Sequence, residues 1–330
     1  MNPDMMAAML LDEETIWAMN AKLDTDTIKA GTGNRYSPVR TAGFIGLLTL
    51  GLSCAYPRQM DYSSHYNQEL AHYTCHRASG PVSVDGRLNE TDWQRAPKSS
   101  PFVDIVTGKP GWYDTRVAML WDDRCLYFGF TVEEPDVWAT LTDRDSKIWF
   151  DNDVEVFIAG KDAYYELEVN ALNTIYEVFW IWKDMYRPGS PYNVPEWNPE
   201  GRNLMVIDGI GGQVHPRGWR NGYLDWDFPG LLHGVHVDGR LNKRDDVDRG
   251  WTVELAFPWE GMKWLADGRS LPPKEADIWR IDCSRFEQVG PKGEKLETAA
   301  GWTWNRHGHY DSHIPETFTY VHFTEKIVGK

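Results

Sequence analysis

A chain of 330 residues with 42% hydrophobic content is long enough to bury a substantial core, as one large domain or two ordinary ones. Its formal net charge of -15 argues against a nucleic-acid partner, because phosphate backbones reward concentrated Lys and Arg, and it suits neutral polar ligands or cations better. The 17 Trp, 15 Tyr and 12 Phe exceed ordinary usage, and such rings either pack a core or stack on ring-shaped ligands.

Residues 1–60 form an N-terminal lead followed by a signal-like segment. The long apolar run that begins at Ala42 is too short to span a bilayer, and Arg35 and Arg40 precede it in the order of a secretion signal. The run ends at Cys54 and resembles a bacterial lipoprotein signal, whose cysteine is acylated. We therefore expect an exported protein, extracellular or in the cell envelope, with a lipid anchor on Cys54; a buried hairpin or helix is the alternative.

The four cysteines, Cys54, Cys75, Cys125 and Cys283, include no CxxC pair and no metal-ligand spacing, so no zinc site is expected. If Cys54 carries lipid, the other three cannot all pair with one another. Cys125 in "RCLYFGF" occupies a core strand position, where a thiol behaves as a small hydrophobe.

Residues 61–330 have the pattern of short strands separated by turns, without intervening helices. Residues 115–135 predict a hairpin, and the other strand candidates are "DVEVFIAG", "YYELEVNAL", "TIYEVFWIW", "GWTVELAFPW", "IWRIDCSRFE" and "TFTYVHF". The fold class is therefore all-β, an antiparallel β-sandwich. Residues 183–235 are rich in Gly, Pro, Asn and aromatic residues and predict a loop-rich insertion, which serves either binding or packing.

Two of these strands carry aligned acidic side chains. Alternation in "KIWFDNDVEVFIAG", read as one strand, puts Trp149 on the same face as its acids, and "YYELEVN" has a similar polar face. If the strands pair, one patch holds Trp149, Asp151, Asp153, Glu155, Glu166, Glu168 and Asn170. Such a patch either faces water or meets a cation or a hydroxyl-rich ligand such as a sugar, which also stacks on aromatic rings.

The ordered segments "VSVDGRLNETDWQRAP", "VAMLWDDRCLYFGFTVEEP", "WFDNDVEVFI", "YYELEVNAL" and "RGWTVELAFPW" resemble the family 9 carbohydrate-binding modules over roughly residues 75–325. The resemblance implies an antiparallel β-sandwich that binds sugar chain ends, often with structural calcium. It also implies that Trp149 stacks on sugar, that Glu155 accepts sugar hydroxyl groups and that Asn170 is a polar ligand.

The sequence departs from the family pattern at two points. Glu168 stands where the family has arginine, and we expect Arg285, on a late strand, to restore that charge. The family's second sandwiching tryptophan has no clean counterpart. Tyr310, Trp304 or Trp302 is expected to replace it, and Glu166 to assist binding.

The expected function is thus non-catalytic carbohydrate binding in support of polysaccharide breakdown, beside a partner glycoside hydrolase. Two alternatives remain: a glycoside hydrolase acting through paired carboxylates, and a haem- or metal-binding sandwich. The second rests on a set of histidines, namely His72, His76, His215, His233, His236, His307, His309 and His313. Carboxylates in "DNDVE" and "WDDR" are candidate ligands for a structural calcium ion.

Overall fold

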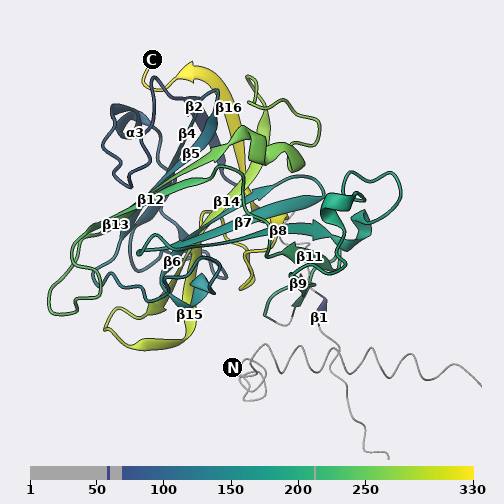
Figure 1. Ribbon diagram of the computed structural model, residues 1–330. Helices are drawn as coiled ribbons and strands as arrows, with labels where there is room; N and C mark the ends of the chain where they lie inside the picture. Colours follow the sequence, from purple (N-terminus) through teal and green to yellow (C-terminus); the bar gives the residue numbers. More distant parts are fainter. Residues whose placement is uncertain (1–57, 60–68, 212) are drawn as a thin grey trace, which may run out of the picture. The chain divides into compact units, whose positions relative to one another are not determined.

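The computed structural model describes residues 58–59, 69–211 and 213–330, all within the compact unit Pro57–Lys330 (Figure 1). The signal-like segment and Cys54 lie outside these residues, so export and lipidation remain predictions. No helix among the described residues is long and apolar enough to cross a membrane.

One large sheet of 14 strands builds the domain. Its first half consists, in spatial order, of β12 (Leu232–Asp238), β13 (Gly250–Pro258), β5 (Cys125–Glu133), β4 (Thr115–Trp121) and β2 (His72–Arg77). The second half continues with β16 (Thr319–Ile327), β14 (Ile278–Val289), β6 (Asp153–Ala159), β7 (Ala163–Asn170), β8 (Ile175–Trp182), β11 (Arg220–Tyr223) and β9 (Leu204–Ile207). Branching from β14 are β15 (Lys295–Thr303) and then β3 (Val103–Asp104).

The two halves of the sheet share one hydrophobic core, because each strand turns its apolar alternate residues inward. In the first half Phe128 and Phe130 of β5 are fully buried, and in the second half Val154, Val156 and Ile158 of β6 meet them in the same cluster. The strands of the two halves cross at an angle in Figure 1. The predicted β-sandwich is confirmed.

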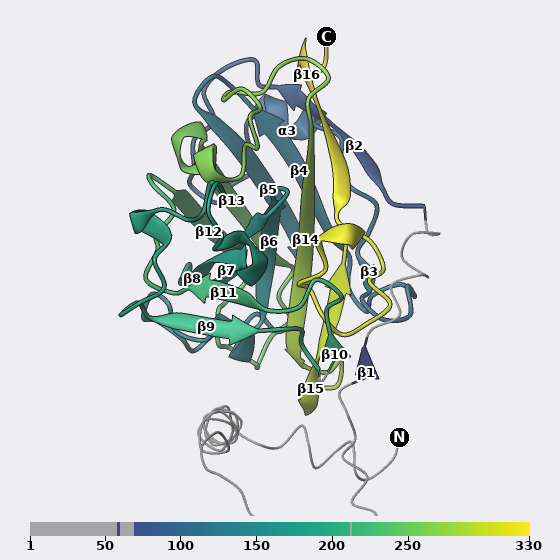
Figure 2. The same cartoon turned by 90° about the vertical axis from the view of Figure 1, so that its right-hand side faces the viewer.

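The sheet is mixed rather than purely antiparallel. Strand β2 pairs in parallel with both β4 and β16, and it thereby joins the two halves (Figure 2). The β4–β5 hairpin forms as predicted, with a turn whose Asp122 carboxylate accepts hydrogen bonds from the backbone N–H groups of Arg124 and Cys125.

Short helical turns and two small strands complete the domain. They are α3 (Thr91–Arg95), η2 (Ile148–Phe150), η3 (Lys183–Met185), η4 (Pro195–Trp197), η5 (Trp259–Trp264) and η6 (Pro315–Thr317), with β1 (Arg58–Gln59) parallel to β10 (Gln213–Val214).

The insertion over residues 183–235 extends the sheet at its β8 edge through β11 and β9. Its aromatic residues are mostly buried: Trp197 stacks on Phe179 of β8 at 4.5 Å between ring centroids, and Tyr223 packs edge-on against Trp197. These rings therefore pack the fold. The three described cysteines, Cys75, Cys125 and Cys283, are buried and form no disulfide.

Candidate functional site

The predicted acidic patch forms where β6 pairs with β7. In this antiparallel register Glu155 lies opposite Glu168, and Asp153 lies opposite Asn170. Directly opposed residues point to the same face, so these polar side chains share the outer face of the second half-sheet, opposite the core. Strand β6 begins only at Asp153, since Trp149 lies in the preceding turn η2.

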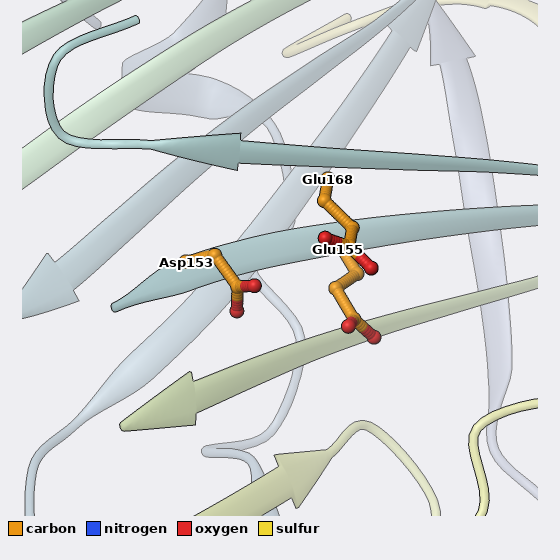
Figure 3. Close-up of side chains that lie close together, drawn as sticks. All are labelled: Asp153, Glu155 and Glu168. Carbon is orange, nitrogen blue, oxygen red and sulfur yellow. The ribbon is translucent and has the colours of Figure 1, made fainter. Parts of the chain in front are cut away.

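Three carboxylates converge on this face, and we call Asp153, Glu155 and Glu168 the acid trio. One oxygen of each lies within 4.8 Å of the others, and Figure 3 shows the side chains on one side of the sheet. All three are buried, with 0%, 4% and 3% of their surface exposed. Asp153 Oδ2 and Glu168 Oε2 are buried without a hydrogen-bond partner. The trio therefore has acceptor capacity that the described protein leaves unused.

Burial raises the pKa of every member of the acid trio. The pKa of Glu155 reaches about 7, chiefly through desolvation, although hydrogen bonds from Ser284 and Ser312 oppose the rise. The pKa of Glu168 lies well above its ordinary range because burial and the charges of Glu155 and Asp153 disfavour its ionised form; a hydrogen bond from the Trp149 backbone N–H opposes this. The pKa of Asp153 rises for similar reasons.

Lysine and arginine do not neutralise this cluster from within the described residues, and the basic group that acts on it is the His307 imidazole, whose charge lowers the pKa of Glu155. The ion pairs of residues 69–211 and 213–330 include none between the acid trio and a lysine or arginine. Carboxylates this close together share protons or meet a positive group, because their mutual repulsion opposes full ionisation.

Two partly buried aromatic rings flank the acid trio on opposite sides. Trp149 packs edge-on against Tyr176 at 5.0 Å between centroids, and Tyr176 is the cross-strand neighbour of Glu168. On the other side Tyr310 packs edge-on against Phe286 at 5.8 Å, and Phe286 lies opposite Asp153.

The position of Tyr310 makes it the one of the three candidate second aromatics that adjoins the acids. Burial raises the pKa of its hydroxyl group, and the charges of Glu155 and Asp153 raise it further. Its hydroxyl group donates a hydrogen bond of 2.8 Å to the carbonyl oxygen of Ala299, which fixes the ring.

The tryptophan of the sequence pattern lies beside the acids although its backbone is not part of the strand. Lys147 Nζ lies 5.9 Å from the centroid of the Trp149 ring. The neighbouring Phe150 is 60% exposed and 5.7 Å from Trp149, so the turn presents one ring to the acid trio and a second to the outside.

The side-chain amide of Asn170 makes its hydrogen bonds within the protein. Its Nδ2 donates to Leu141 O and Asp151 Oδ2, both at 2.9 Å, and its Oδ1 accepts from the N–H groups of Leu172 and Thr174. Asp151 in turn accepts hydrogen bonds from the loop before η2. The two residues hold the loop that carries Trp149, which is a positioning task and leaves no amide group free for a ligand.

Glu166 lies one step further along β7 and is also engaged. Its Oε2 accepts a hydrogen bond of 2.6 Å from Trp180 Nε1, and its Oε1 lies 3.6 Å from His313 Nε2. Burial, with the charge of Glu155, raises its pKa to about 8.

Arg285 does not reach the acid trio. It lies opposite Val154 on β14, which puts its side chain on the inner face, where it pairs with Glu287 at 2.6 Å and Glu134 at 3.4 Å. The prediction that Arg285 replaces the charge missing at Glu168 is therefore wrong, because the alternation of β14 turns its side chain away from the acid trio.

Trp302 and Trp304 also lie away from the acid trio. Trp302 lies opposite Arg285 on β15, 3% exposed, and packs edge-on against Trp112. Trp304 is 5% exposed and packs edge-on against Tyr73 in the core. Both rings serve packing, and neither offers a free face beside the carboxylates.

Sequence reasoning proposed Tyr310 and Trp304 from the segment 304–318 as stacking rings, but it missed that the segment as a whole is a wall of the site. His307 in this segment hydrogen-bonds Asp282 at 3.1 Å, and His313 hydrogen-bonds the Tyr164 hydroxyl at 3.0 Å, so the segment lies over the outer face. The sequence does contain a signal for the surface that this segment covers. Alternation in "IDCSRFE" places Asp282 and Ser284 together on one face of their strand.

No group of three or more potential metal ligands that includes a histidine occurs in the part of the chain that the structure describes. The one group of three potential ligands there is the acid trio, which contains no histidine. His215 and His233 hydrogen-bond Glu316 and Asn173 respectively.

The two segments predicted to bind calcium differ in how the protein uses their carboxylates. In "WDDR", Asp122 is used by backbone N–H groups and Asp123 pairs with Arg77. In "DNDVE", Asp153 and Glu155 belong to the acid trio, whose hard oxygen donors are of the type that calcium prefers.

The hydrolase alternative gains no support from the geometry. Retaining glycosidases hold their two carboxyl groups about 5 Å apart, and inverting enzymes about 6.5–9.5 Å apart. The members of the acid trio are buried side by side on adjacent strands, instead of facing one another across a cleft.

Comparison with known proteins finds similarity in fold. No family model and no curated protein matches the sequence. A protein of Bacteroides uniformis described as a candidate carbohydrate-binding protein shares 13% identity, with a TM-score of 0.51, over 78% of this chain and 100% of its own. Family 9 carbohydrate-binding modules from Caldicellulosiruptor kristjanssonii, solved with cellotriose and with glucose, share 11% identity over 77% of this chain and 94% and 96% of theirs, each with a TM-score of 0.43. The structural neighbours thus include the family that the sequence resembles.

Proposed function

We propose that this chain is a non-catalytic carbohydrate-binding protein whose site is the acid trio with Trp149 and Tyr310. One observation carries the proposal: two aromatic rings lie on opposite sides of three buried carboxylates, two of which have unpartnered oxygens. Rings stack on the C–H faces of a sugar, and carboxylate oxygens accept its hydroxyl groups. The sandwich fold, shared with the structural neighbours, is consistent with this role.

The test is a binding screen against a panel of oligosaccharides, followed by calorimetry on the best ligand with Trp149→Ala. We expect this variant to lose about tenfold or more in affinity, since a stacked indole supplies much of the contact with a sugar ring. Phe150→Ala is the matched control, because that ring is adjacent but points outward. Equal binding by wild type and Trp149→Ala, with both proteins folded, would refute the proposed platform.

We further propose that the protein is exported, anchored through Cys54 and active beside a glycoside hydrolase in polysaccharide breakdown. The support is the basic-then-apolar sequence that ends at Cys54. Labelling with a radioactive fatty acid should mark the wild type and not Cys54→Ala; equal labelling of both would contradict the anchor.

Structural calcium is the alternative proposal for an occupant of the same acid trio, whose oxygen donors are of the type that calcium prefers. A bound structural ion would stabilise the folded state, so a chelator should lower the Tm and added calcium should restore it. An unchanged Tm in the chelator would contradict a structural ion.

A further inference from the structure

The acid trio lacks hydrogen-bond donors for some of its oxygens. Asp153 is fully buried and Glu168 nearly so, yet Asp153 Oδ2 and Glu168 Oε2 have no hydrogen-bond partner. Buried carboxylate oxygens in proteins almost always have one. Two such atoms in a cluster that also contains Glu155 indicate that donors come from outside the described residues.

A donor that carries positive charge meets two needs of the acid trio at once. Three carboxylates within 4.8 Å repel one another, and no lysine or arginine within residues 69–211 and 213–330 forms an ion pair with them. A neutral hydroxyl group supplies a hydrogen bond but leaves this repulsion in place. A cationic donor satisfies the unpartnered oxygens and also offsets the charge.

The number of acceptors distinguishes an ammonium group from a calcium ion. Calcium takes six to eight oxygens, whereas an ammonium group has three N–H donors. The three carboxylates have six oxygens, but Asp153 Oδ1 and Glu155 Oε2 already accept hydrogen bonds from the Phe286 N–H and the Ser284 hydroxyl group. At most four oxygens remain, which is fewer than calcium takes and enough for the three donors of an ammonium group.

The flanking rings indicate what carries the ammonium group. Trp149 and Tyr310 stand on the two sides of the acid trio, as rings that hold a flat, ring-shaped ligand. Indole and phenol faces also attract a neighbouring cation. We infer that the ligand is an amino sugar with a free amine, whose ammonium group is held by Asp153, Glu155 and Glu168 while its ring lies between Trp149 and Tyr310. This inference rests on the proposed function and names the class of sugar.

Three disaccharides of one shape provide the test: the β-1,4-linked dimer of glucosamine, the same dimer N-acetylated, and the dimer of glucose. Calorimetry with the full chain should give an affinity for the free amine at least about tenfold above both neutral sugars, because charge-assisted hydrogen bonds are the stronger ones. Glu168→Gln should remove this preference, because it keeps the shape of the side chain but takes away its negative charge. Glu297→Gln, an exposed acid on β15, should leave it intact and so controls for the general negative charge.

The outcomes distinguish a failure of the amino-sugar inference from a failure of the proposed function. A preference for the free amine that disappears in Glu168→Gln supports the inference. Should Glu168→Gln fail to fold, Glu155→Gln serves in its place. Equal or tighter binding of a neutral dimer overturns the inference while the proposed function stands. Binding of none of these sugars or of any other in a panel overturns the proposed function itself. A preference that a chelator abolishes identifies a metal ion as the cation and also overturns the inference.

Discussion

Replacing Glu155 with Gln should change how the stability of the domain depends on pH. Burial raises the pKa of this carboxyl group from 4.5 to about 7 in the folded protein. Below about pH 4.5 the group is protonated whether the chain is folded or unfolded. Between that value and about 7 only the unfolded chain ionises it, so unfolding becomes easier as the pH rises.

The size of the effect follows from the same two values. A rise in pKa from 4.5 to about 7 corresponds to about 3 kcal/mol of unfolding free energy, present at low pH and lost by about pH 8. Glu155→Gln keeps the shape of the side chain and an oxygen to accept the Ser284 hydroxyl hydrogen bond, but it cannot ionise. The variant should therefore gain on wild type as the pH rises, by up to about 3 kcal/mol, or several degrees in Tm.

Urea unfolding followed by tryptophan fluorescence, at a series of pH values from about 5 to about 8, measures this difference. Glu297→Gln, on the exposed part of β15, is the matched control and should follow wild type throughout. A difference between Glu155→Gln and wild type that stays constant with pH, or that favours wild type increasingly at high pH, would refute the reasoning.

Two further substitutions test the packing behind the site. Arg285→Met should cost about 3–5 kcal/mol, because it leaves Glu134 and Glu287 buried without their cation; chemical unfolding at neutral pH measures the loss. Gly86→Ala should cost about 2–4 kcal/mol by the same assay, because Gly86 has φ +83° and an added Cβ would lie 2.4 Å from the backbone carbon of Val235.

Each of these changes has a control of the same chemistry. Arg249→Met removes an arginine that is 80% exposed, and the unfolding free energy should stay close to that of wild type. Gly80→Ala adds a methyl group with nothing within 4 Å and should be nearly neutral. Losses in the controls equal to those at Arg285 and Gly86 would show that the buried ion pairs and the close backbone approach are not the cause.

The fold was predictable from the sequence because strand alternation is a local property. Val154, Val156 and Ile158 alternate with Asp153 and Glu155, and that pattern alone sets which side of β6 meets the core. The pairing of β6 with β7 follows from their closeness in the chain. The parallel pair of β2 with β16 was not predictable, since it joins segments more than 200 residues apart.

The candidate site was predictable in its acids and less so in its surroundings. Glu155 and Glu168 meet because two adjacent strands pair in register. Arg285 lies on a strand that was recognised, and its alternation with the apolar Cys283 puts it on the inner face, so the prediction from charge alone was wrong. Tyr310 adjoins the acids through the path of an irregular segment, and such a path depends on tertiary contacts rather than local propensity.

The parallel pairing of β2 with β16 has a mechanical consequence. The first long strand of the described domain lies beside the last, and because they run in the same direction, His72 begins β2 at the opposite end of the pair from Ile327, where β16 stops. Tension applied through the two ends of the domain therefore acts along the strands and loads their hydrogen bonds together in shear, instead of opening them one at a time like a zipper.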